Sequence, residues 1–179
     1  MQNENQFKQI YDEFKQLVYN LALHYTQHTN DAQDITQDVF VKVYQHYNKY
    51  DPAAASVRTW IYCITINRCL DFLRNKKTKK RFGFMTSLFR SDTNEPLNEA
   101  IQPDHPGIKA EDKEEMQQLF TLINELPENQ RTALILTRIE DRSQREVAEI
   151  MNTTVKAVEA LLQRAKQALA KKLKDREGF

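Results

Sequence analysis

The sequence predicts an all-α protein with two small helical domains joined by a flexible acidic linker, the second of them a helix-turn-helix domain. Three observations predict this fold class. Only three glycines occur among 179 residues, whereas sheets with tight turns need glycine wherever φ is positive. Apolar residues recur at helical spacing over most of the chain. Five of the eight Pro and Gly residues fall between positions 83 and 107, in a polar, aperiodic stretch that is typical of a linker.

The N-terminal domain is expected to span residues 1–80 and to contain three helices. Over residues 7–25, apolar side chains recur at i, i+3, i+4 and i+7, which predicts an amphipathic helix. The second helix is expected to begin at Asn30 as its N-cap. Its segment VFVKVY is rich in β-branched residues, as strands are, but the clean cap and the absence of nearby turn residues favour a helix. Ser56 is the expected cap of the third helix.

The C-terminal domain is expected at 112–179, after a linker at 81–111. Ser143 and Glu146 fit a capping box, and Asn152 suits a left-handed turn before a long last helix. A short helix, a three-residue turn and a longer helix match the helix-turn-helix plan of DNA-binding proteins. An ordinary helical hairpin with a solvated charged face is the alternative on pattern alone.

Charge is distributed in blocks that the overall net charge of +1 hides. Residues 1–70 carry a net charge of −1 and residues 71–90 carry +6. Residues 91–128 carry −8 and residues 129–179 carry +4. The near-zero total is therefore no argument against a polyanionic partner. The acidic block is open to two interpretations, a mimic of nucleic acid or a solvated spacer.

Other features bear on location and chemistry. No apolar run approaches the ~18 residues of a spanning helix, and the N-terminus lacks the pattern of a secretory signal, so we expect a cytoplasmic protein. Cys63 and Cys69 lie about 9 Å apart along one predicted helix, too far for a disulfide. His24 and His28 have metal-pair spacing without a third ligand, so we expect a surface or packed pair. We expect no enzyme activity, cofactor, metal or small-molecule substrate.

Motifs of both halves resemble bacterial sigma factors. The C-terminal half resembles region 4, which reads the −35 promoter element, through Leu126-Pro127-x-x-x-Arg131, Glu140-x-x-Ser143-x-x-Glu146-Val147-Ala148 and Arg164-Ala165-Lys166-x-x-Leu169. The N-terminal half resembles region 2 through Asp31-Ala-Gln-Asp34-x-x-Gln37-Asp38-x-Phe40 and Trp60-Ile-Tyr-x-Ile-x-x-Asn67-x-x-x-Asp71-x-x-Arg74. With two regions and little else, the chain is similar to the small extracytoplasmic-function (ECF) class.

The resemblance implies a role for each matching residue. A polar face of the second helix would bind the clamp helices of core RNA polymerase: Asp31, Asp34, Gln37 and Asp38. Around the third helix, seven residues would bind and melt the −10 element as single-stranded DNA: Arg58, Trp60, Asn67, Asp71, Arg74, Lys76 and Lys77. In the last domain, seven residues would bind the −35 duplex: Arg131, Arg145, Lys156, Glu159, Ala160, Gln163 and Arg164.

Some details of this reading stay open. The loop 48–56 would form the pocket for a flipped −10 base, but its alanines do not indicate which base the pocket prefers. Asp71 can instead pair with Arg68 or Arg74, and Trp60 can be a core residue. Glu159 stands where many relatives carry Lys or Arg, and an acid there can accept a hydrogen bond from cytosine or weaken binding. The apolar segment 82–89 can pack on a domain, touch a membrane surface or bind a regulatory partner.

The sequence therefore predicts a sigma factor that directs core RNA polymerase to promoters. The resemblance also implies an anti-sigma partner, often one that is tethered to the membrane. Two rival functions remain at this point. The first is a helix-turn-helix transcriptional regulator that acts without polymerase, against which only the region 2 motifs argue. The second is a helical adaptor without a nucleic-acid partner.

Overall fold

The computed structural model describes the backbone of residues 2–89 and 110–177, and side chains of residues 5–79 and 116–175. All regular elements in these residues are helical, which confirms the all-α fold class. In the first half they are α1 (Gln2–Thr26), α2 (Thr29–His46), the 3-10 turn η1 (Tyr47–Lys49) and α3 (Val57–Phe89). In the second half they are α4 (Ala110–Asn124), α5 (Glu128–Leu134), the π-helical turn η2 (Ile135–Ile139), α6 (Gln144–Ile150) and α7 (Val155–Glu177).

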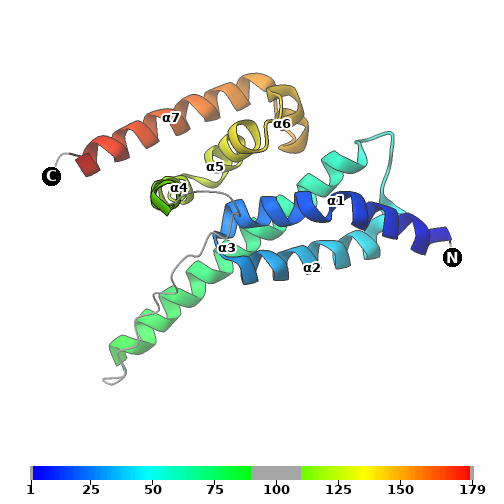
Figure 1. Cartoon of the computed structure of the whole chain (residues 1–179), viewed down its shortest axis with the longest axis horizontal. Coiled ribbons are helices and arrows are strands. Elements are labelled where there is room, and N and C mark those ends of the chain that lie inside the picture. The colour runs from blue at the N-terminus through cyan, green and yellow to red at the C-terminus, as the bar shows by residue number, and fades with distance from the viewer. Residues whose placement is uncertain (1, 90–109, 178–179) are drawn as a thin grey trace.

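The boundaries of the two domains and the linker stay predictions. Helix α3 continues to Phe89, inside the range that the sequence assigns to the linker. The backbone of the apolar segment 82–89 is thus helical, but its side chains lie outside the described residues, and so does the rest of the expected linker from 90 to 109. The long α3 extends away from the other helices in Figure 1.

The α1–α3 bundle is held by one buried stripe from each helix. In α2 the β-branched residues Ile35, Val39 and Val43 recur every four residues and are completely buried. A spacing of four places them on one helical face, whereas in a strand Val41 would share their side; Val41 is instead 54% exposed. Burial of this stripe against α1 and α3 confirms the helix that the sequence predicted for VFVKVY.

The cap of α2 differs from the prediction. His28 rather than Asn30 is the N-cap, with its backbone extended and its Nδ1 accepting a hydrogen bond from the Asp31 amide at 3.3 Å. Gln27 takes a positive φ of 56° between α1 and α2, which allows α2 to start at Thr29. Ser56 caps α3 as expected, since its Oγ accepts from the Thr59 amide at 3.1 Å.

The helix-turn-helix unit follows the predicted local signals. Ser143 and Glu146 form the capping box of α6, with both reciprocal hydrogen bonds present. Asn152 has a φ of 49°, the left-handed conformation that asparagine tolerates better than most residues. The Thr154 hydroxyl then accepts from the Ala157 amide at 3.2 Å and caps α7. These local hydrogen bonds fix where α7 starts and hence which of its residues face outward.

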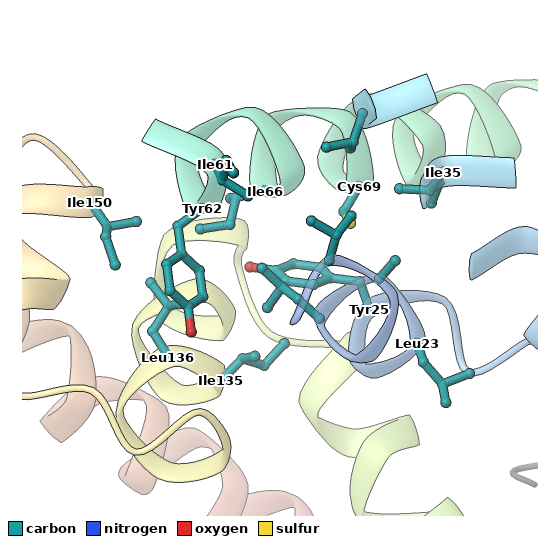
Figure 2. Close-up of a cluster of buried hydrophobic side chains, with 14 of the residues drawn as sticks. Leu23, Tyr25, Ile35, Ile61, Tyr62, Ile66, Cys69, Ile135, Leu136 and Ile150 are labelled. Atoms are coloured by element: carbon teal, nitrogen blue, oxygen red, sulfur yellow. The ribbon is translucent and has the colours of Figure 1, made fainter. Parts of the chain in front are cut away.

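The two halves share a continuous hydrophobic core. Helices α5 and α6 and the turn η2 lie beside α1 and α3, as Figure 1 shows. Figure 2 shows side chains of both halves meeting in this core: Ile135, Leu136 and Ile150 from the second half beside Tyr25, Tyr62 and Ile66 from the first. Burial of apolar surface across the boundary therefore stabilises this arrangement of the halves.

Replacing Leu21 tests the core of the α1–α3 bundle. Leu21 is completely buried, so Leu21→Ala should lower the free energy of unfolding by about 2–5 kcal/mol through lost contacts and a cavity. Val41→Ala is the matched control, because Val41 on α2 is 54% exposed. Urea denaturation followed by circular dichroism measures both variants. Equal effects of the two substitutions would contradict the core described here.

Candidate polymerase and nucleic-acid interfaces

The predicted polymerase face of α2 has two exposed residues and two carboxylates that form ion pairs with α3. Asp34 and Gln37 are exposed. Asp31 is partly buried and accepts a hydrogen bond from Lys76 Nζ at 2.9 Å. Asp38 pairs with Arg68, whose Nε lies 2.9 Å from Asp38 Oδ2. Two of the four predicted residues are therefore available to a partner without breaking an ion pair.

Those two ion pairs join the predicted polymerase face to the predicted −10 helix. Lys76 and Arg68 both belong to α3, and their carboxylate partners both belong to α2. Arg68 was expected as a possible partner of Asp71, but Asp71 pairs with Arg74 at 3.3 Å instead. Because α2 and α3 run in opposite directions, Arg68 reaches across to Asp38 and Lys76 to Asp31, whereas Arg74 lies one turn from Asp71 on the same helix.

Near its start, α3 presents Arg58 and Trp60. Arg58 is exposed, and its guanidinium lies 5.6 Å from the ring centroid of Phe14, at cation–π range. Trp60 is half-buried against the core, and its ring centroid lies 5.0 Å from that of Tyr50. Tyr50 belongs to the loop that the resemblance implies as the pocket for a flipped base, and its hydroxyl donates to the Ala55 carbonyl at 2.8 Å. Trp60 therefore packs on the core and also contacts this loop through Tyr50.

Farther along α3, the predicted −10 residues face the second half of the chain. Asn67 lines a cavity of about 300 Å³ between the halves, together with Leu70 of α3 and Asn129, Ile150 and Asn152 of the second half. Arg74 forms a bidentate ion pair with Glu128 at the start of α5, with distances of 3.0 and 2.6 Å. Lys77 is exposed. Asn67 and Arg74 are exposed as well, so in this arrangement one cation of the predicted −10 face is paired but the face is not buried.

A partly buried polar cluster also joins the halves. The Glu140 carboxylate lies 3.0 Å from His24 Nδ1 and accepts from the Tyr62 hydroxyl at 3.1 Å. The Tyr25 hydroxyl donates to Thr132 Oγ1 at 2.8 Å. Burial raises the pKa of both phenols, and the Glu140 carboxylate raises that of Tyr62 further. Both tyrosines therefore stay protonated and keep donating these hydrogen bonds.

The predicted −35 face of α7 is open. Lys156, Glu159, Gln163 and Arg164 are exposed, and Ala160 is half-buried. Their spacings of three, four and seven place these residues on one side of the helix, directly after the turn. Arg145 on α6 is exposed and lies 3.7 Å from Glu149. The exposed face thus carries cations, an amide and one carboxylate, and its binding to a −35 duplex stays a prediction.

Arg131 departs from the predicted −35 set. Its side chain is buried, with only 2% of the residue exposed. The guanidinium lies 5.4 Å from the Tyr25 ring centroid, and Nη1 donates to the Asn124 carbonyl at 3.3 Å. Burial lowers the pKa of this guanidinium. In this structure Arg131 packs on Tyr25 of α1, and its role at the −35 duplex stays a prediction that would require this side chain to become exposed.

Sequence reasoning missed the residues that join the halves. Glu128 and Arg74 are 54 positions apart, and Tyr25 and Thr132 are 107 apart, so no local pattern connects them. His24 was considered only for its spacing from His28, although its ring stacks on Phe120 at 5.9 Å. A usable signal did exist for one other cluster. Phe7 with Tyr11 and Phe40 with Tyr44 each stand four apart, the spacing of neighbouring side chains on a helix.

Metal-ligating side chains lie scattered in the described part of the chain. No group of three or more His, Cys, Asp or Glu side chains there could hold a metal ion. Cys63 and Cys69 are free thiols, and burial raises the pKa of Cys69 to about 12. Cys63 donates to the Ile150 carbonyl at 3.2 Å. Within the searched part of the chain, no helix is long and apolar enough to cross a membrane.

The Arg74–Glu128 pair predicts a pH-sensitive contact between the halves. Hydrogen bonds from Arg74 hold the pKa of Glu128 below its usual value of 4.5. The pair therefore stabilises the packed arrangement above pH 4.5, and this contribution is lost as the pH falls through the lowered pKa. Glu128→Gln should increase the radius of gyration at pH 7 in small-angle X-ray scattering. Glu149→Gln is the control, and a Glu128→Gln chain as compact as the wild type would contradict the prediction.

Comparisons with known proteins identify both halves. Residues 10–79 match the family Sigma-70 region 2, and residues 116–169 match Sigma-70, region 4. The chain is 27% identical to the ECF RNA polymerase sigma factor SigW of Bacillus subtilis, over 97% of this chain and 91% of SigW. It is 26% identical to SigM of the same organism, over 90% and 91% of the two chains.

Solved structures share the fold. CnrH in complex with the cytosolic domain of CnrY matches with a TM-score of 0.66 at 22% identity, over 96% of this chain and 90% of CnrH. The sigma factor RpoE of Bartonella quintana, in complex with the anti-sigma factor NepR, matches with a TM-score of 0.62 at 19% identity, over 94% and 97%. The two sigma-70 regions lie in the predicted order and together cover more than half of the sequence. The chain therefore belongs to the ECF sigma factors of the sigma-70 family.

Proposed function

We propose that this chain directs core RNA polymerase to specific promoters in the cytoplasm, reading the −35 element as duplex and the −10 element as single strand. The observation that carries the proposal is the presence of region 2 and region 4 in one chain, in that order. The chain contributes recognition surfaces, and we infer that it carries no catalytic group, metal or cofactor of its own.

For polymerase binding, the exposed part of the α2 face is the first contact. Asp34 and Gln37 lie one turn apart on this face and are exposed. A carboxylate beside an amide suits basic and polar side chains of a partner helix. Asp31 and Asp38 stabilise the position of α2 on α3 through Lys76 and Arg68, so they support the shape of this surface.

For −10 recognition, α3 supplies an amide and cations on one helix. Asn67 can read a base edge, while Arg74 and Lys77 can contact phosphates of the displaced strand. Arg74 now binds the Glu128 carboxylate, which occupies the place that a phosphate would take. We therefore infer that the halves move apart when promoter DNA binds, and that Arg74 exchanges a carboxylate for a phosphate.

For −35 recognition, α7 needs no such rearrangement. Lys156, Gln163 and Arg164 are already exposed on its outer face. The capping hydrogen bonds at Ser143 and Thr154 fix α6 and α7 relative to the turn between them, which gives a rigid helix to insert in the major groove.

We also propose an anti-sigma factor as a regulatory partner, either tethered to the membrane or free. CnrH and RpoE, whose folds resemble that of this chain, were solved with CnrY and with the anti-sigma factor NepR. A partner that stabilised the packed halves would keep Arg74 paired with Glu128 and so unavailable to a DNA phosphate. Such a partner would act without competing for any catalytic site.

In vitro transcription on a genomic promoter library, with purified core polymerase, tests the proposal. New, discrete start sites that appear only when the chain is added would support it. The rival function, a regulator that acts without polymerase, predicts protected DNA sites in the absence of core polymerase and no new start sites. An adaptor predicts neither result, and salt-sensitive binding to DNA would argue against it.

Asp34→Asn tests the polymerase face. The substitution should weaken binding to core polymerase several-fold at low salt and less at high salt, because it removes one exposed charge. Surface plasmon resonance with immobilised core polymerase measures this effect. Asp175→Asn on exposed α7 changes the net charge equally and should bind like the wild type. Equal losses for both variants would point to overall charge rather than to the α2 face.

Glu159→Gln tests base reading at the −35 element. The Glu159 carboxylate can accept a hydrogen bond from a cytosine amine but not from a thymine carbonyl. The substitution should therefore change the preferred base at one position more than it changes overall affinity. Selection from a randomised −35 duplex library measures the preference, with Glu13→Gln, exposed on α1, as the control. A uniform change in affinity across all sequences would contradict base reading by Glu159.

A further inference from the structure

Aromatic side chains gather at one end of the α1–α3 bundle. This end combines the start of α1 with the end of α2, and the α2–α3 loop leaves from it in Figure 1. The ring centroids of Phe7 and Tyr44 lie 5.1 Å apart, and those of Tyr11 and Phe40 lie 4.7 Å apart. Yet Tyr11 is 41% exposed and Tyr44 is 58% exposed. We call the cluster of Phe7, Tyr11, Phe40 and Tyr44 the aromatic end.

Beside these rings the surface is hollowed. A cavity of about 270 Å³ is lined by Phe7, Tyr44, Gln45, Tyr47 and Asn48. Three of the five residues are aromatic and the other two carry amide groups. This volume lies at the lower limit of small-molecule sites, which run from roughly 300 to 1,000 Å³. The hollow therefore suits one flat, polar-edged group rather than a large ligand.

The aromatic row continues from the hollow into the loop of the expected −10 pocket. The Tyr47 and Tyr50 ring centroids lie 6.4 Å apart with an interplanar angle of 20°. The Tyr50 ring in turn lies 5.0 Å from Trp60. Asn48, which lines the hollow, is the first residue of the loop 48–56. A strand whose flipped base entered that loop would have its neighbouring nucleotides close to the hollow.

Charge along α2 also distinguishes this end from the polymerase face. The acidic residues Asp31, Asp34 and Asp38 all lie within the first ten residues of the helix. Lys42 and His46 follow in its second half, and Lys49 follows in η1; all three are exposed. The nearby Asp51 carboxylate is engaged by the Ala53 amide at 2.9 Å. Exposed cations between stacked aromatic rings are the pattern of single-strand binding surfaces.

We infer that the hollow at the aromatic end is a second base-binding site, which holds one unpaired base of the single-stranded promoter DNA next to the base in the loop 48–56. Tyr44 and Tyr47 stack on the face of the base, and the Gln45 and Asn48 side chains lie where its edge would be. The inference rests on the proposed function, because it assigns a subsite to the same single strand. Lys42 and Lys49 lie beside the phosphates.

Substitutions at Tyr44 test this site in the complete chain bound to core polymerase. Tyr44→Leu keeps an apolar side chain but removes the ring, so it should weaken binding of a fluorescein-labelled oligo-dT of about twelve nucleotides by about five- to twenty-fold. Tyr44→Phe keeps the ring and should bind like the wild type. Val41→Ala, exposed on the same helix and outside the hollow, is the control. Fluorescence anisotropy gives the affinities, with core polymerase alone subtracted.

The possible outcomes separate the inference from the proposed function. If Tyr44→Leu binds DNA as the wild type does, the second site is wrong even though the wild-type complex initiates transcription. If Tyr44→Leu and Val41→Ala both lose core polymerase, the aromatic end is a protein-docking surface, which also overturns the inference. If the wild-type complex neither binds the oligonucleotide nor initiates on any promoter, the proposed function itself fails.

Discussion

The packing of α5 and η2 on α1 and α3 is the constraint on which the accessibility of every functional surface depends. The contact is not purely apolar. Glu140 receives hydrogen bonds from the first half, Tyr25 bonds Thr132, and Arg131 covers the Tyr25 ring. Buried polar groups are usually paired, and Glu140 and Tyr25 find their partners across the boundary. Arg131 contacts the Tyr25 ring across the boundary, but its hydrogen bond goes to the Asn124 carbonyl of its own half. The polar pairs thus specify one orientation of the halves, while the shared core stabilises it.

In this orientation the predicted polymerase, −35 and −10 surfaces differ in what their side chains contact. The outer face of α7 and the Asp34–Gln37 part of α2 are exposed. Asn67 and Arg74 of α3 are exposed too, but Asn67 lines the cavity between the halves and Arg74 is paired with Glu128. The packed state therefore leaves the predicted polymerase and −35 faces open, and at the predicted −10 face it pairs one cation, Arg74, with a carboxylate. Separation of the halves would break the Glu128 ion pair and expose the cavity beside Asn67. DNA phosphates would offset the first of these losses.

Local elements could be predicted from the sequence because their causes are local. The burial stripe of α2, the capping box at Ser143 and the left-handed Asn152 each depend on residues within a few positions of one another. The resemblance also indicated which helix faces carry binding residues. The burial of Arg131 could not be predicted, since an arginine near a helix-turn-helix ordinarily suggests a phosphate contact. Its partner Tyr25 lies in the other half, and only the packed structure brings the two together.

The distance between the halves, measured before and during promoter binding, tests the central claim most directly. Donor and acceptor dyes at the exposed positions Gln33 on α2 and Glu149 on α6, introduced in a chain whose native cysteines are replaced, report this distance by energy transfer. The account predicts high transfer in the free chain and a clear decrease in the complex with core polymerase and promoter DNA. Unchanged transfer in a complex that initiates transcription at the correct site would contradict it, because the −10 face would then act while Arg74 still lies beside Glu128.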